Sequence, residues 1–175
     1  GRKLEEKLED MIGRMVDDLA ARLPRDEERG LPSGPSLLRA CLPFVEGAPE
    51  PLLRYVALGG EGVDGDSDRA IDFEDRLIDV LHSNLLARAG GRYELEPPVR
   101  AYLERRRGAD EERMRALRLL HATAHLAVAA GYDEAIREGA MTYRAPTAWA
   151  EVTAAVAFLS DAVSLDRDIS LEIAF

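Results

Sequence analysis

The chain has 175 residues, of which 46% are hydrophobic and 32% are charged, a composition typical of a soluble globular protein with one domain or two small ones. Its formal net charge of −10 argues against a general nucleic-acid binder, because such proteins gain most of their affinity by neutralising phosphates. A single cysteine excludes an internal disulfide framework, and no apolar run approaches the roughly 18 residues of a membrane span.

Residues 1–30 predict an amphipathic helix followed by a linker. The first ten residues are charged and lack the apolar centre of a signal peptide, so we expect a cytoplasmic protein. Apolar residues recur at helical spacing and define one face, which consists of Leu4, Leu8, Met11, Met15 and Leu19. The helix is expected to end near Leu23-Pro24, where a polar segment with proline and glycine begins.

Two short helices are predicted next. Ser36 is the expected N-cap of a helix over Leu37–Leu42, and Pro49 is expected to open another over Leu52–Leu58. Cys41 lies among apolar residues, so we expect a small core residue and not a nucleophile. A glycine-rich run ends the second helix and leads into an acidic loop.

The most informative stretch runs from Phe73 to Arg107 and predicts a helix, a two-stranded hairpin and a second helix. The first helix has an apolar face formed by Phe73, Leu77, Val80, Leu81 and Leu85. Gly90-Gly91 separate the strand-like runs Leu86–Ala89 and Arg92–Leu95, and two glycines supply the positive φ that a tight hairpin turn requires. The second helix is expected to begin after Pro97-Pro98. This pattern predicts a winged helix-turn-helix domain.

Residues 108–175 predict a helical, repeat-like segment. A long helix is expected from about Asp110 to Ala130, followed by Gly131 at its end and by Asp133 as the cap of the next helix. A last helix carries an apolar stripe at spacings of three and four, formed by Trp149, Val152, Val156, Leu159 and Val163. We expect this stripe to bind a protein partner, a second copy or adjoining domains of a longer chain.

Residues Asp75–Arg106 resemble the winged helix that follows the nucleotide-binding domain of STAND-type (NB-ARC/NACHT-like) signalling NTPases. The shared features are a helix ending in a double leucine, the Gly90-Gly91 turn, Arg92-Tyr93, and the helix Val99–Leu103. The resemblance places the winged-helix domain over residues 31–107.

Residues Ala130–Ile136, followed by Ala140 and Pro146, look like the turn and second helix of a tetratricopeptide repeat. STAND proteins often place such repeats after the winged helix. The two resemblances imply a mainly α fold with a small β-hairpin wing, and a regulatory, protein-interaction segment of a larger ATPase. No phosphate-binding loop of the form Gly-x-x-x-x-Gly-Lys-Ser/Thr is present, so we expect neither catalysis nor a cofactor in this segment.

An acidic segment offers an alternative metal site. Carboxylates occupy positions 1, 3, 5 and 12 of a calcium-loop pattern, namely Asp64, Asp66, Asp68 and Asp75. Position 6, which needs glycine for a sharp turn, is Arg69. Asp is also the residue expected in solvated loops and at helix N-caps, so our prediction contains no metal site.

Two alternative functions use basic residues. Arg118 and His125 lie seven residues apart on the long helix, and their spacing resembles the Arg…His motif of HEPN ribonucleases, in which the His removes a ribose proton. Arg88, Arg92 and Arg100 are the candidates for contacts to DNA in a winged-helix regulator. Against DNA as a partner, the presumed recognition helix carries one Arg and three acids, which are Glu74, Asp75 and Asp79. We therefore do not expect nucleic acid as the partner.

Overall fold

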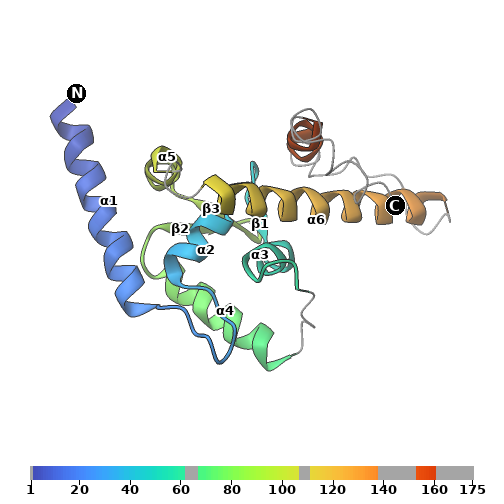
Figure 1. Ribbon diagram of the computed structural model, residues 1–175, viewed down its shortest axis with the longest axis horizontal. Helices are drawn as coiled ribbons and strands as arrows, with labels where there is room; N and C mark the ends of the chain where they lie inside the picture. The colour runs from blue at the N-terminus through green and yellow to red at the C-terminus, as the bar shows by residue number, and fades with distance from the viewer. Residues whose placement is uncertain (1, 62–66, 107–110, 138–152, 161–175) are drawn as a thin grey trace.

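The computed structural model describes residues 2–61, 67–106, 111–137 and 153–160. In these ranges the chain is mainly helical and contains one small antiparallel sheet, as Figure 1 shows. The elements are α1 (Arg2–Arg22), α2 (Gly34–Ala40), β1 (Ala48–Pro49), α3 (Glu50–Ala57), α4 (Asp68–Leu81), β2 (Leu86–Ala89), β3 (Arg92–Leu95), α5 (Pro97–Arg105) and α6 (Glu111–Arg137). Residues 153–160 form a further helical segment. Among the described helices, none combines the length and apolar character needed to span a membrane.

Helix α1 confirms the predicted N-terminal helix, but only part of its predicted apolar face is buried. The residues of α1 that enter the core are Ile12, Val16 and Leu19, whereas Leu4, Leu8 and Met11 are exposed. From Glu9, which pairs with Arg105, to its C-terminus, α1 packs against α5 and α2, and its first turns extend away from the other elements (Figure 1). The apolar stripe of the first turns is therefore left uncovered within the described residues.

Helix α2 starts earlier than predicted. Its N-cap is Ser33 and not Ser36, and the Ser33 hydroxyl accepts a hydrogen bond from the Ser36 amide at 3.4 Å. Gly34 and Pro35 occupy the first two positions of the helix. Backbone amides at these positions have no acceptor within the helix, so a proline, which has no N–H, costs the helix no hydrogen bond. Helix α3 begins directly after Pro49, as predicted.

The predicted hairpin is confirmed. Strands β2 and β3 pair antiparallel with Leu86 opposite Leu95, and both leucines are buried. Gly90 and Gly91 form the turn with φ of +57° and +78°. The sheet also contains β1, which pairs with β3 through Ala48 and gives the order β1-β3-β2. A two-residue strand has no periodicity of its own, so local pattern could not reveal it.

One hydrophobic core joins α1 to the hairpin. Every element between α1 and β3 contributes a buried side chain to it. The fully buried ones, from helices, strands and loops, include Leu19, Leu37, Leu38, Phe44, Leu53, Phe73, Leu77, Leu85 and Tyr93. Helix α6 packs along α3 and contributes Met114 and Leu117 to the same core. The boundary predicted between residues 107 and 108 thus does not separate two cores in the described part of the chain.

The turn predicted at Gly131 is wrong. Helix α6 runs without a break from Glu111 to Arg137, so Gly131 and Asp133 lie inside it. A glycine in a helix interior costs only about 1 kcal/mol relative to alanine, and the flanking alanines and Glu134 are strong helix formers. The tetratricopeptide-like turn is therefore absent from this helix.

Replacing Gly90 and Gly91 together with Val should lower the free energy of unfolding by about 1–3 kcal/mol. No other atom lies within 4 Å of a Cβ built at either position, so the cost arises from the positive φ and not from a clash. Urea denaturation of the double Asn variant is the matched control, because Asn tolerates the left-handed region. Equal stability of the Val variant and the wild type would contradict this turn.

Candidate functional site

Arg100 is a structural residue and not a contact for DNA. Its guanidinium donates to the carbonyl oxygens of Leu42 at 2.9 Å, Phe44 at 2.7 Å and Cys41 at 3.4 Å. These carbonyls lie just after the end of α2. No later turn of the helix supplies backbone amides that could donate to them. Arg100 on α5 therefore joins the end of α2 to the helix that follows the hairpin.

The other two arginines of the predicted DNA surface also contact the protein itself. Arg92 Nε donates to the Gly47 carbonyl at 3.2 Å and is partly buried. Arg88 is exposed, and its guanidinium lies over the Tyr93 ring at 5.4 Å from the ring centroid. The structure does not bring the three arginines together as one exposed basic surface.

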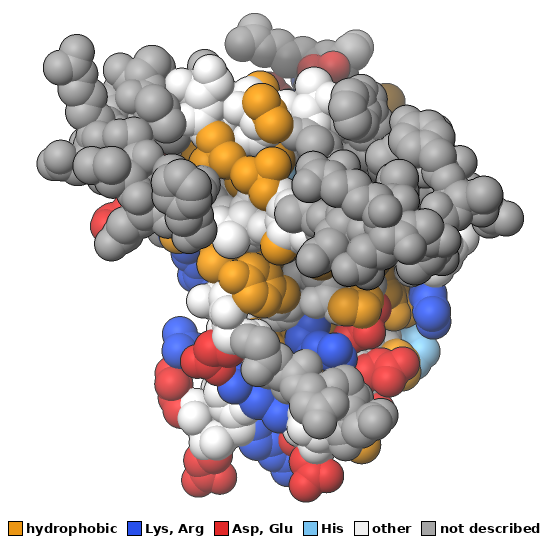
Figure 2. All heavy atoms as spheres, turned by 90° about the vertical axis from the view of Figure 1, so that its right-hand side faces the viewer, with side chains coloured by type: hydrophobic (Ala, Val, Ile, Leu, Met, Phe, Trp, Pro, Cys, Tyr) orange, Lys and Arg blue, Asp and Glu red, His pale blue; other side chains and the backbone are white. Residues whose placement is uncertain are grey.

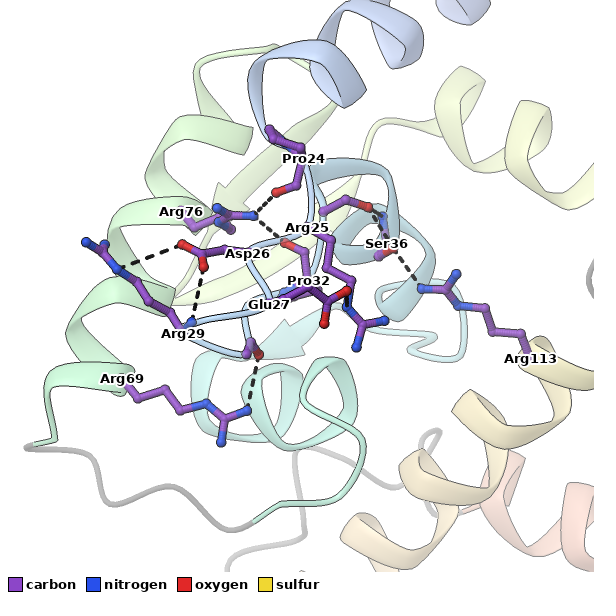
Figure 3. Close-up of polar contacts among 12 residues, drawn as sticks. Pro24, Arg25, Asp26, Glu27, Arg29, Pro32, Ser36, Arg69, Arg76 and Arg113 are labelled. Carbon is purple, nitrogen blue, oxygen red and sulfur yellow. Dashed lines mark hydrogen bonds and ion pairs between the residues drawn. The ribbon is translucent and has the colours of Figure 1, made fainter.

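Both arginines of α4 point towards the linker, the segment over residues 23–33 that joins α1 to α2 (Figure 3). Arg76 donates to the carbonyl oxygens of Pro24 at 2.6 Å and Pro32 at 2.7 Å. Arg69 donates to the Gly30 carbonyl at 3.1 Å and forms an ion pair with Glu61. The linker therefore lies over α4, although 44 and 52 residues separate Arg76 from its two partners in sequence.

The opposite surface of α4, which we call the α4 face, is acidic with two apolar residues. It consists of the exposed side chains Asp68, Ile71, Glu74, Asp75, Ile78 and Asp79. Ile71 is 54% exposed and Ile78 is 41% exposed, and seven residues, or about two helical turns, separate them. The carboxylates of this surface repel phosphates.

The residues of the alternative nuclease site do not form an accessible site. His121 and His125 are both buried, and their rings lie 4.8 Å and 5.6 Å from the Phe44 ring between centroids. His125 Nδ1 lies 3.0 Å from the His121 carbonyl oxygen, and Arg118 is partly buried on the same helix. A base that removes a ribose proton must come within hydrogen-bonding distance of it. His125, which is 2% exposed, lies within the core.

The structure describes only part of the alternative calcium site. Asp64 and Asp66 lie outside the described residues, whereas Asp68 and Asp75 both belong to α4. Seven helical residues span about 10 Å, so these two carboxylates are too far apart along the helix to share one ion. Within the described ranges, no group of three potential metal ligands occurs.

The predicted partner stripe is only partly visible. Trp149 and Val152 lie outside the described residues. In the helical segment over 153–160, Val156 is 52% exposed, Leu159 is partly buried and Ala155 is buried. The stripe remains a prediction.

Sequence analysis missed a cavity of about 440 Å³ between the linker, the end of α3 and α6. Its charged lining combines Arg25 and Glu27 from the linker, Arg69 from α4 and Arg113 from α6, together with Glu61. No motif spans these positions, because they come from separate parts of the chain. Only the packing of the linker against α4 and α6 brings them together.

Comparisons with models of protein families, with curated proteins and with solved structures find no match to this chain.

Replacing Arg100 with Ala should lower the free energy of unfolding by about 2–3 kcal/mol, because three carbonyls lose their charged donor. Replacing Arg88 with Ala should cost less than about 1 kcal/mol, since only a ring contact is lost. Urea denaturation of both variants measures the difference. Similar losses in both would argue against the structural role of Arg100.

Burial raises the pKa of the Cys41 thiol from 9.0 to about 12, against a smaller lowering by Arg100. The native thiol should therefore resist alkylation by iodoacetamide at pH 8 and react once urea unfolds the chain. The thiol has its higher pKa in the folded state, so between pH 9 and pH 12 it ionises only when the chain unfolds. The thiol therefore leaves the free energy of unfolding unchanged below pH 9 and lowers it as the pH rises towards 12. Wild type should lose roughly 1 kcal/mol more per pH unit there than Cys41→Ala. Parallel pH curves would contradict the shift.

Proposed function

We propose that this chain is a non-catalytic winged helix-turn-helix module that binds protein and belongs to a larger signalling ATPase of the STAND type. The order of the elements supports the winged helix. Helices α2, α3 and α4 precede the β2–β3 hairpin, and β1, between α2 and α3, completes the sheet. The resemblance of residues Asp75–Arg106 supports the STAND assignment. The proposal does not include the tetratricopeptide repeat, because α6 has no break at Gly131.

The observation that carries the protein-binding function is the acidity of the α4 face. In a DNA-binding helix-turn-helix, the second helix of the pair enters the major groove, and α4 has that position after α3. Here α4 directs its two arginines to the linker and its exposed carboxylates to solvent. The helix that would approach the phosphates would therefore repel them.

The same face favours a particular kind of protein surface. Ile71 and Ile78 are spaced so that one partner helix can contact both, and the surrounding carboxylates select Lys and Arg at its margins. An adjoining domain of the larger protein or a separate protein can supply such a surface.

A charge-reversal experiment tests the role of the α4 face. Wild type should not bind a fluorescent DNA duplex at about 150 mM salt, whereas the triple variant Glu74→Lys, Asp75→Lys, Asp79→Lys should gain salt-dependent binding. The control is Glu5→Lys, Glu6→Lys, Asp10→Lys, which makes the same charge change at exposed positions of α1. Fluorescence anisotropy measures both. Binding by wild type, or equal gains in both variants, would overturn the proposal.

The ATPase assignment has a separate test. The reading frame that encodes this chain should contain, upstream, a phosphate-binding loop of the form Gly-x-x-x-x-Gly-Lys-Ser/Thr. Sequencing the flanking DNA decides this. A frame without such a loop would remove the ATPase from the proposal and leave the protein-binding module intact.

A further inference from the structure

Two exposed helical faces of this chain have complementary chemistry. Most large hydrophobic side chains that are exposed in the described part of the chain lie on two helices: Leu4, Leu8 and Met11 on α1, and Ile71 and Ile78 on α4. Apolar side chains that gather on one exposed face commonly mark a site of association. The charged residues beside the two groups are of opposite sign.

The exposed face at the start of α1, which we call the α1 face, has a basic edge. It consists of Lys3, Leu4, Lys7, Leu8, Met11 and Arg14, all of them exposed. At 3.6 residues per turn, the three basic residues fall on one side of the apolar ones, on the edge away from the core. Glu6 and Asp10 lie behind this edge, farther from the apolar residues. Glu9 lies on the core side and pairs with Arg105.

The α4 face has the opposite charge. Its carboxylates flank the isoleucines on both sides, Glu74 on one side and Asp75 and Asp79 on the other. Within the described ranges, no ion pair involves a charged residue of the α1 face or of the α4 face. The charges of both faces are therefore available to a partner.

The apolar residues of the two faces also have the same spacing. The interval from Leu4 to Met11 is seven residues, which corresponds to about two helical turns. It equals the interval from Ile71 to Ile78. Two helices packed side by side can therefore bring both pairs into contact at once. Because carboxylates lie on both sides of the isoleucines, the basic edge meets a carboxylate in either direction of α1.

The two faces do not meet within one chain. Helix α1 packs against α2 and α5, and its first turns rise towards the upper left of Figure 1, whereas α4 lies at the lower end. Figure 2 shows Asp and Glu side chains along this lower end of the molecule, where α4 and the linker lie in Figure 1. A contact between the α1 face and the α4 face thus requires two copies of the chain.

The other pairings of two copies are disfavoured. Two α4 faces would bring carboxylates together. Two antiparallel α1 faces related by a two-fold axis would set one basic edge against the other. A parallel pair of α1 helices would need the opposite edge of the apolar residues, where Ile12 is already buried in the core. Only the pairing of α1 with α4 joins opposite charges.

We propose that the α4 face binds the α1 face of a second copy of this chain. This inference rests on the proposed protein-binding function and names the partner. Leu4 and Met11 of one copy contact the isoleucines of the other, and the basic edge of α1 pairs with the carboxylates of α4. Two copies can make this contact twice around a two-fold axis, or a series of copies can make it head to tail.

Sedimentation equilibrium of the full chain tests the proposal with two charge variants. The first is Lys3→Glu, Lys7→Glu, Arg14→Glu, and the second is Glu74→Lys, Asp75→Lys, Asp79→Lys. Wild type should associate with a dissociation constant on the order of 100 μM, as suits a small interface. Each variant alone should associate at least about tenfold more weakly, because both of its faces then carry the same charge. An equimolar mixture should regain the association, because each α1 face again meets an α4 face of opposite charge.

Two further variants separate the contact from general charge effects. Arg22→Glu, Arg25→Glu, Arg88→Glu makes the same charge change as the first variant at exposed positions outside both faces, and it should associate like wild type. Leu4→Gln, Met11→Gln keeps every charge and should weaken association at least about tenfold. It decides the result if a charge variant does not fold.

A wild type that stays monomeric up to about 1 mM would overturn the proposal. So would unchanged association in either charge variant or in Leu4→Gln, Met11→Gln, an equal loss in the arginine control, or no association in the mixture. The DNA experiment keeps the two ideas apart. If wild type is monomeric and does not bind the DNA duplex, the second copy is wrong as the partner and the proposed protein-binding function is retained.

Discussion

Arginine side chains that donate to the carbonyls of loops are the interactions on which the rest of this fold depends. Backbone carbonyls in a loop have no neighbouring strand or helical turn to satisfy them, yet leaving them buried without a partner is costly. Arg76 donates to the carbonyl oxygens of Pro24 and Pro32 in the linker, and Arg100 donates to carbonyl oxygens beyond the end of α2. The linker also has one antiparallel β-bridge of its own, between Asp26 and Leu31. The two arginines hold the linker and the end of α2 in place.

This use of arginine also determines the character of the surface. When Arg69 and Arg76 face the linker, the exposed side of α4 keeps its carboxylates, and the helix in the recognition position becomes acidic. A winged helix by itself does not define a function, since function depends on the groups that the fold presents. Here those groups are carboxylates beside Ile71 and Ile78, and on them rests our proposal of a protein partner in place of DNA.

The candidate site was predictable in part. The acids of α4 and the glycine turn of the hairpin were evident from sequence, since both depend on residues that are close along the chain. Arg92 and Arg100 are candidates for DNA contacts only in an alternative interpretation of the sequence, because sequence does not show whether a long cationic side chain reaches solvent or a carbonyl more than 40 residues away. The cavity was missed for the same reason, since the linker, α4 and α6 each contribute one arginine.

By itself, the sequence determined the mainly helical class, the apolar faces of α4 and α5, and the β2–β3 hairpin. These features follow from periodicity and from the conformational freedom of Gly90-Gly91, which act over a few residues. Tertiary structure decided which part of α1 is covered and that β1 joins the sheet. In both cases the local preference was weak or could be satisfied in two ways, and packing between distant segments made the choice.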